Sequence, residues 1–287
     1  MASNARAGGF VSMSPVKAAV VGHVEWIEFV PVERVPHPGE IVHAEESWEE
    51  AGGGGAVAAV QFSKLADSVL FFTALGEDAC GHRAEAELRE RGIEVHASYV
   101  DVSQRRAITY VDETGERTIT TIGRRLGPRG HDEALPWHEL SRCDAVYFCA
   151  GDVDALRLAR RARVLVATAR VLGTLQQGAV ELDALVGSAK DDSERYHPGD
   201  LDPEPRLTVS TSGALGGWAQ PGGPFSGAPA PAGGGDGDAY GAGDCFAAGL
   251  AFALAAEVDV TEALAFAARC GAGALAGPGV HAEAVSL

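Results

Sequence analysis

The residues best suited to chemistry lie in the stretch 238–246, where small residues precede an acid. Gly241, Ala242 and Gly243 come before Asp244, and apolar residues then recur at the spacing of one helix face. A helix that opens on a glycine turn offers free N–H groups and the positive end of its dipole, which together bind anions such as phosphate. Asp244 there could take a proton from an attacking hydroxyl. The stretch therefore predicts phosphoryl transfer; the alternative is that Asp244 only caps the helix.

The rest of the chain supplies strands and helices that would position this loop. Short apolar runs alternate with helical segments, a pattern that indicates parallel strands with right-handed crossovers. The runs are 18–22, 68–75, 145–149, 164–168, 185–187 and 207–211, and a helical stretch is expected near residue 182. We expect an α/β fold with three layers, a mostly parallel central sheet covered by helices on both faces, and ligands beyond the carboxyl ends of its strands. The connection 195–206 is too short and too rich in proline for a crossover helix.

Two polar regions, the first interrupted by prolines, do not fit the central sheet. Segments 26–48 and 97–123 predict short strands, the second forming a hairpin across 106–122, and together a small β lid. Basic side chains in the second segment and directly after it could bind an anionic substrate group, or could simply be solvated; these are Arg105, Arg106, Arg124 and Arg125.

Composition narrows the classes of protein to consider. The 287 residues are 46% hydrophobic and carry a net charge of −17, which argues against nucleic-acid or anionic-membrane partners. Five scattered cysteines, an odd number without a C-x-x-C pair, suit a reduced cytoplasm. No apolar run reaches membrane-spanning length. We expect one domain over 16–287, preceded by a flexible tail at 1–15 without the apolar core of a signal peptide.

The string 238–246 resembles the C-terminal signature of the ribokinase-like (PfkB) family of carbohydrate and nucleoside kinases, usually Asp-Thr-x-Gly-Ala-Gly-Asp before a small residue and Phe. Six positions match, and Ala239 replaces the usual Thr. The resemblance extends from Gly22 to about Gly279. It implies an ATP-dependent, magnesium-requiring kinase in which Asp244 is the base and the N–H groups of 241–243 hold the anion. The loop of Ala239 also contributes to a monovalent-cation site in relatives, so dependence on such a cation is left open.

Further motifs resemble the acceptor site of this family. The glycine run that opens a helix implies acceptor contacts from the backbone of Gly53, Gly54 and Gly55. Val57 stands where sugar kinases usually have Asn. Relatives bind substrate hydroxyls with an acid shortly after the first strand, for which Glu25 and Glu28 are the candidates; the alternative is that both are carboxylates on an exposed edge strand.

Motifs for nucleotide and metal follow the later strands. The stretch 188–194 resembles the family's Asn-x-x-Glu motif, so Glu194, with Asp191 in the Asn place, is implied to serve magnesium. The stretch 211–216 resembles the family's Thr-x-Gly-x-x-Gly loop. With the first residue of the signature, it implies the nucleotide contacts Thr211, Gly213, Gly216 and Asp238.

The resemblance implies a sugar, sugar-like or nucleoside acceptor and a homodimer formed through the lid. Two other functions remain to be compared with the sequence. A dinucleotide-dependent oxidoreductase is disfavoured because no G-x-G-x-x-G follows the first strand. A catalytically silent relative that binds a metabolite for regulation is the alternative, because Ala239, Val57 and the short 195–206 connection could reflect a decayed site.

Overall fold

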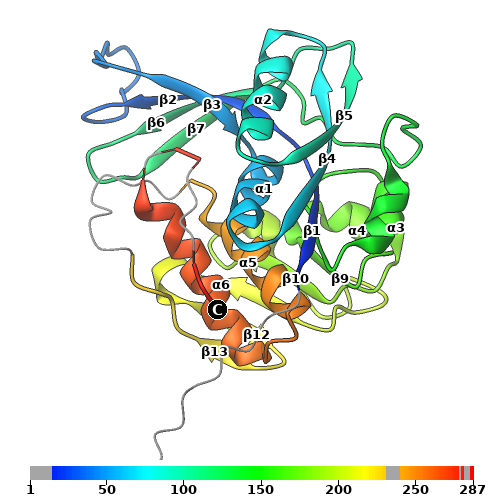
Figure 1. Ribbon diagram of the computed structural model, residues 1–287. Helices are drawn as coiled ribbons and strands as arrows, with labels where there is room; N and C mark the ends of the chain where they lie inside the picture. The colour runs from blue at the N-terminus through cyan, green and yellow to red at the C-terminus, as the bar shows by residue number, and fades with distance from the viewer. Residues whose placement is uncertain (1–14, 231–239, 278, 281–284) are drawn as a thin grey trace, which may run out of the picture.

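A large sheet forms the centre of the molecule (Figure 1). The computed structural model describes residues 15–230, 240–277, 279–280 and 285–287, and in this part of the chain the sheet has the strand order β13-β12-β11-β10-β9-β8-β1-β4-β5. Its strands are β1 (Lys17–Val21), β4 (Ser68–Gly76), β5 (Glu94–Val100), β8 (Ala145–Phe148), β9 (Val164–Thr168), β10 (Ala184–Ser188), β11 (Thr208–Thr211), β12 (Gly217–Gln220) and β13 (Gly223–Phe225). Neighbours from β5 to β11 pair parallel, and β12 and β13 add an antiparallel edge. The expectation of a mostly parallel sheet is confirmed.

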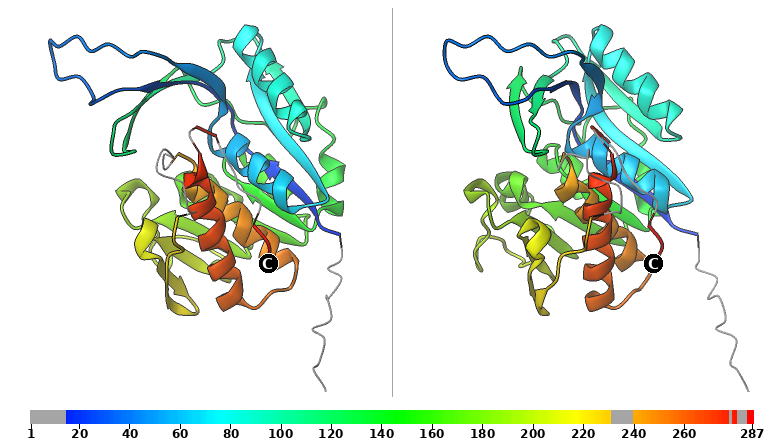
Figure 2. Two further views of the ribbon diagram at one scale, coloured as in Figure 1. Left: turned by 60° about the vertical axis from the view of Figure 1, so that its left-hand side comes forward. Right: turned by 90° about the vertical axis from the view of Figure 1, so that its left-hand side faces the viewer.

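Helices cover both faces of this sheet and give the three layers expected (Figure 2). One core lies under α1 (Gly54–Leu65), α2 (Ala79–Glu90), α5 (Ala242–Ala255) and α6 (Val260–Gly273). The other lies under α3 (Val153–Ala159), α4 (Leu172–Gly178) and the 3₁₀ helix Trp137–Arg142. Adjacent residues of one strand enter opposite cores, Val20 the first and Val21 the second, as strand geometry requires. Further 3₁₀ turns span Ala169–Val171, Asp192–Glu194, Gly213–Leu215 and Ala274–Ala276.

Helix α5 is buried along most of its length because it lies between the sheet and α6. Small residues make this possible. A Cβ at Gly249 would come within 2.6 Å of the Cys270 sulfur on α6, so only glycine allows the two helices to approach this closely. The close fit holds the amino end of α5 in a fixed position relative to the sheet.

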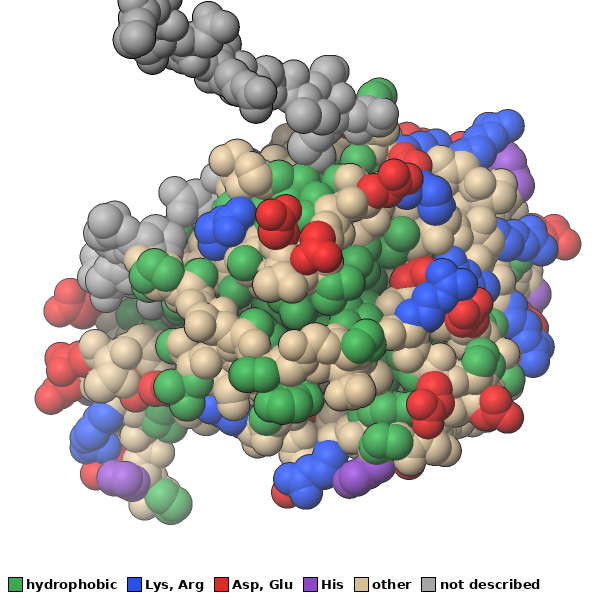
Figure 3. Space-filling model, turned by 90° about the horizontal axis from the view of Figure 1, so that it is seen from below, with side chains coloured by type: hydrophobic (Ala, Val, Ile, Leu, Met, Phe, Trp, Pro, Cys, Tyr) green, Lys and Arg blue, Asp and Glu red, His purple; other side chains and the backbone are tan. Residues whose placement is uncertain are grey.

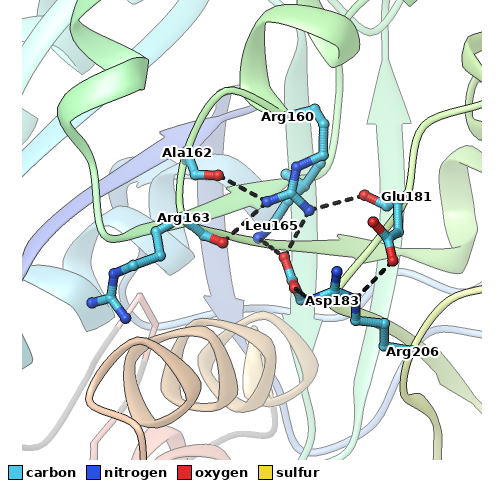
Figure 4. Close-up of polar contacts among 7 residues, drawn as sticks. All are labelled: Arg160, Ala162, Arg163, Leu165, Glu181, Asp183 and Arg206. Carbon is cyan, nitrogen blue, oxygen red and sulfur yellow. Dashed lines mark hydrogen bonds and ion pairs between the residues drawn. The ribbon is translucent and has the colours of Figure 1, made fainter.

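The connection between β10 and β11 contains no helix longer than the turn Asp192–Glu194, as its length predicts. A polar network ties the amino ends of β9, β10 and β11 together instead (Figure 4). Asp183 accepts hydrogen bonds from the Leu165 N–H at 2.8 Å and from Arg160 at 2.7 Å. Arg206 donates to Asp183 at 3.3 Å and to Glu181 at 2.8 Å. The helical stretch expected near residue 182 lies earlier, in α4.

A second, smaller sheet has the order β3-β2-β6-β7 and lies apart from the large one (Figure 1). Its strands are β2 (Glu25–Pro31), β3 (Trp48–Gly52), β6 (Arg106–Val111) and β7 (Arg117–Ile122). Residues 97–100, which the expected lid segment included, lie in β5 of the large sheet. No helix in the described ranges is both long enough and apolar enough to cross a membrane.

Candidate active site

A cavity of about 400 Å³ opens at the carboxyl ends of β1, β8, β9, β10 and β11. That edge is where a parallel sheet is expected to bind ligands. Residues from the glycine run, the small sheet and the amino end of α5 complete its wall. Of the candidate residues, those lining it are Glu25, Gly53, Gly54, Glu194, Thr211, Gly213, Gly241, Ala242, Gly243 and Asp244.

Asp244 lies in the first turn of α5, as its sequence context predicts. Gly241 immediately precedes the helix with φ 74°, a left-handed conformation that favours glycine. The described residues contain no hydrogen-bond acceptor for the Ala242 and Gly243 N–H groups, which are therefore available to an anion in the cavity. The loop thus holds a carboxylate and free donors on one wall.

A buried tyrosine orients the Asp244 carboxylate. The hydroxyl of Tyr147, at the end of β8, donates to Asp244 Oδ1 at 2.8 Å. Burial, and next the negative charge of Asp244, raise the Tyr147 pKa well above its ordinary value, so the phenol stays protonated and can only donate to the carboxylate. The hydrogen bond leaves the rest of the Asp244 carboxylate open to the cavity.

The glycine run reaches this carboxylate directly. A Cβ added to Gly54 would lie 2.7 Å from Asp244 Oδ1, so only glycine leaves room for the acid. The N–H of Gly53 donates to the Tyr240 hydroxyl at 2.7 Å, which fastens the run to the loop before α5.

Gly55 does not line the cavity; its N–H donates a hydrogen bond to the His23 carbonyl at 3.2 Å. Val57 is buried and would clash with any Cβ at Gly241, which makes it a packing residue beneath the loop.

The two acidic candidates on β2 have different environments. Glu25 is 7% exposed, lines the cavity and forms an ion pair with Arg105 at 2.6 Å. Glu28 lies outside the cavity lining and accepts a hydrogen bond from Ser47. Positions three apart on a strand face opposite sides, so only one of the pair could reach the site. Among these two, the geometry supports Glu25 alone as an acceptor contact.

The other end of the cavity lies beyond β10 and β11. Thr211 and Gly213 line it, whereas Gly216 has φ 90° and a Cβ there would meet the Phe225 carbonyl oxygen at 2.0 Å, so its role is in the turn. Asp191 is exposed, accepts hydrogen bonds from Ser193, and lies outside the lining. Asp238 lies outside the described residues.

Glu194 is the candidate for magnesium, and its carboxylate is already engaged. Arg170 donates to one oxygen and the Ser188 N–H to the other, at 3.0 Å. Within the described ranges, no cluster of three or more His, Cys, Asp or Glu could hold a metal ion. These contacts do not suit direct coordination. They leave lone pairs for water of a hydrated ion, and Mg²⁺ usually keeps several waters.

The sequence is similar to proteins of known family. A family model described as "pfkB family carbohydrate kinase" matches residues 16–177, more than half of the chain. The chain belongs to the pfkB family. Within this family, the ribokinase of Arabidopsis thaliana is 32% identical over 108 residues, which are 36% of this chain and 28% of the relative. The chain thus aligns with under a third of that relative's length.

Solved structures share the fold of this pfkB chain over nearly its whole length. The ribokinase of Thermotoga maritima superposes with a TM-score of 0.70 at 20% identity, covering 92% of this chain and 93% of the other. The Arabidopsis thaliana ribokinase, solved with ribose and ATP, gives 0.65 at 21% identity, covering 91% and 92%. The ribokinase-like fold expected from the sequence is therefore confirmed.

Several residues of the cavity wall are not singled out by any motif in the sequence. Tyr147 lies in an apolar run typical of a buried strand, and no motif marks Arg170 or Lys190 as a ligand. Each lies within a few residues of the carboxyl end of a parallel strand, and polar residues there carry the available signal. Arg117 belongs to the small sheet, where only the structure reveals which side chains turn toward the cavity.

Proposed function

We propose that this chain transfers the γ-phosphoryl group of ATP to an alcohol of a sugar, sugar-like or nucleoside acceptor. The observation that carries the proposal is the loop 241–244, where free N–H groups and the Asp244 carboxylate face one cavity together with Gly54. Donors for a phosphate and a base for a hydroxyl then lie within reach of the same reacting atoms. Membership of the pfkB family supports the same reaction.

Each residue then has a role in the transfer. Gly53 and Gly54, with Glu25, position the acceptor, and Asp244 takes the proton from its hydroxyl. The acceptor oxygen bonds to the γ-phosphorus while the bond to the β–γ bridging oxygen breaks, releasing ADP. The N–H groups of Ala242 and Gly243 stabilise the charge on the transferred group. Thr211 and Gly213 belong to the nucleotide end of the cavity.

Magnesium is part of the proposal. When bound, the ion neutralises charge on the nucleotide phosphates. Glu194 would serve it through water, since both of its oxygens already accept hydrogen bonds.

All five cysteines are free, which agrees with the reducing cytoplasm that we propose as the location.

ADP release from Mg-ATP, with and without a mixture of sugars, phosphosugars and nucleosides, tests this function. The proposal predicts release that depends on an acceptor. ATP and metabolite binding without any release would instead favour a catalytically silent relative that binds a metabolite for regulation.

Glu194→Gln is expected to raise the magnesium concentration needed for half-maximal activity by roughly ten-fold, with a smaller effect on acceptor KM. The amide keeps the size of the side chain but loses the charge that attracts the hydrated ion. Asp191→Asn is the control, because Asp191 lies outside the cavity lining and should leave the titration unchanged. An unchanged magnesium titration for Glu194→Gln would mean that Glu194 does not serve the metal and only forms the ion pair with Arg170.

The small sheet is expected to close over the cavity as a lid, because water must be kept from the γ-phosphorus. Hydrogen exchange in β6 and β7 should slow when a nucleotide analogue and acceptor bind, while β4 in the central sheet should not change. Unchanged exchange in β6 and β7 would rule out the lid.

We also propose a two-fold dimer through this lid. β7 is an edge strand with partly exposed Ile119 and Ile122. Sedimentation measures the mass directly, and a monomer at micromolar concentration would exclude the dimer without affecting the kinase.

A further inference from the structure

The cavity has an unusual charge for a chain of net charge −17. Among the residues that the structure describes, five basic side chains line it, against three acidic ones. The basic residues are Arg105, Arg117, Arg125, Arg170 and Lys190, and the acidic ones are Glu25, Glu194 and Asp244. Elsewhere, as on the face in Figure 3, basic side chains mostly stand beside acidic ones. The described lining of the cavity therefore carries more positive than negative side chains, in contrast to the chain as a whole.

The positive charge of the cavity wall affects the pKa of a buried histidine in the same wall. His23 is 6% exposed, and burial is the main cause that lowers its pKa well below the ordinary value. The positive charges of Arg125, Arg105 and Arg170 lower the pKa further. His23 is therefore neutral and does not compete with the arginines for an anion.

Two of the arginines form no ion pair with an acid in the described part of the chain. Glu25 pairs with Arg105, and Glu194 pairs with Arg170. In the part of the chain that the structure describes, no carboxylate lies within ion-pair distance of Arg117 or Arg125. Arg117 Nη1 is shielded from solvent, and none of the described residues gives it a hydrogen-bond partner. A buried charged donor without a partner is costly, which indicates that a bound group supplies one.

Arg117 lies on the acceptor side of the cavity. Its guanidinium carbon is 5.7 Å from the centre of the Tyr240 ring, and the Tyr240 hydroxyl bonds the Gly53 N–H. Arg170, in contrast, pairs with Glu194 at the end formed by β10 and β11. Arg125 lies just after the small sheet, and of the charges that lower the His23 pKa its effect is the largest; the His23 carbonyl accepts the Gly55 N–H of the glycine run. Both unbalanced arginines are thus placed for the acceptor rather than for the nucleotide.

We propose that the acceptor is a monosaccharide carrying an anionic group, a phosphate or a carboxylate, which Arg117 and Arg125 bind while a hydroxyl faces Asp244. This inference rests on the proposed kinase function. The guanidinium group suits both anions because its N–H donors match their paired oxygens. Arg117 on the small sheet would then bind the anion as the sheet closes over the cavity. Recognition of the acceptor would thereby be coupled to exclusion of water.

The test compares matched neutral and anionic acceptors with the full chain and Mg-ATP. Fructose against fructose 6-phosphate examines phosphate, and glucose against glucuronate, which keeps the pyranose ring, examines carboxylate. Calorimetry without ATP gives the Kd of each sugar, and acceptor-dependent ADP release gives kcat/KM. The expected result is that one anionic sugar binds at least ten-fold more tightly than its neutral partner, an effect of the size of one charge-assisted contact.

Variants identify the residues responsible. Arg117→Gln and Arg125→Gln should each weaken binding of the anionic sugar roughly ten-fold or more, with little effect on the neutral sugar or on ATP. Arg106→Gln is the control, because Arg106 is exposed on the small sheet but does not line the cavity.

The possible outcomes separate this inference from the kinase proposal. Equal or tighter binding of the neutral sugars would overturn the anionic acceptor, as would Arg117→Gln and Arg125→Gln variants that weaken only ATP binding. Phosphorylation of a neutral sugar in either case would leave the kinase intact. Arginine-dependent binding of an anion without any phosphoryl transfer would count against the kinase instead.

Discussion

Asp244→Asn is expected to lower kcat by ~10²–10⁴-fold, the usual contribution of a general base. The amide has nearly the size of the carboxylate and can still accept the Tyr147 hydrogen bond through its oxygen. It cannot take the proton of an acceptor hydroxyl at neutral pH. The loss should therefore appear in turnover, while the KM for ATP changes little.

Two measurements distinguish a loss of the catalytic base from a loss of folding or of acceptor binding. The melting temperature should remain close to the wild-type value, because Asp244 is only partly buried and its size is kept. Acceptor binding, followed by calorimetry, should also persist. A variant that turns over at nearly the wild-type rate would show that Asp244 only caps α5.

Gly54→Ala is expected to lower kcat/KM by roughly 10²-fold, since a shift of about 1 Å in a catalytic group can cost that much. The added Cβ would lie 2.7 Å from Asp244 Oδ1, so the carboxylate must rotate away from its position. Stability should change little, because the clash is with the end of a side chain and alanine favours a helix over glycine. Steady-state kinetics with a thermal melt measures both effects.

Two other glycines provide controls for this variant. Nothing lies within 4 Å of a Cβ at Gly173 in α4, so Gly173→Ala should leave both activity and stability unchanged. A Cβ at Gly55 would meet the His23 carbonyl oxygen at 2.6 Å, and backbone cannot move aside easily, so Gly55→Ala should lower the melting temperature. Wild-type kcat/KM in Gly54→Ala would mean that the observed position of Asp244 is not the one used in catalysis.

Much of the fold could be predicted because its signals are local. Continuous apolar runs separated by helical segments indicated the parallel sheet, and the prolines of 195–206 excluded a helix before β11. The glycine turn and the apolar face that follows it placed Asp244 in a first helical turn. A helix near residue 182 was wrongly expected because its weak pattern did not distinguish α4 from the turn after it.

The site was harder to predict because it depends on which way each side chain faces. Glu25 and Glu28 look equivalent in the sequence, and only the orientation of β2 separates them. Arg105 and Arg106 are consecutive, yet only the first lines the cavity. Tyr147 resembled any core aromatic residue until the approach of α5 placed a carboxylate beside its hydroxyl. Contacts between distant segments decided each of these cases.

Direct detection of the transferred group tests the central claim. The full chain, with ATP labelled in the γ-phosphoryl group, is incubated with magnesium and the neutral and anionic acceptors, and the products are separated and their masses measured. The account predicts label on a hydroxyl of one acceptor, at a rate that Asp244→Asn reduces by ~10²-fold or more. If the protein binds ATP and an acceptor yet moves no label between them, or if Asp244→Asn transfers it as fast as the wild type, the account is wrong.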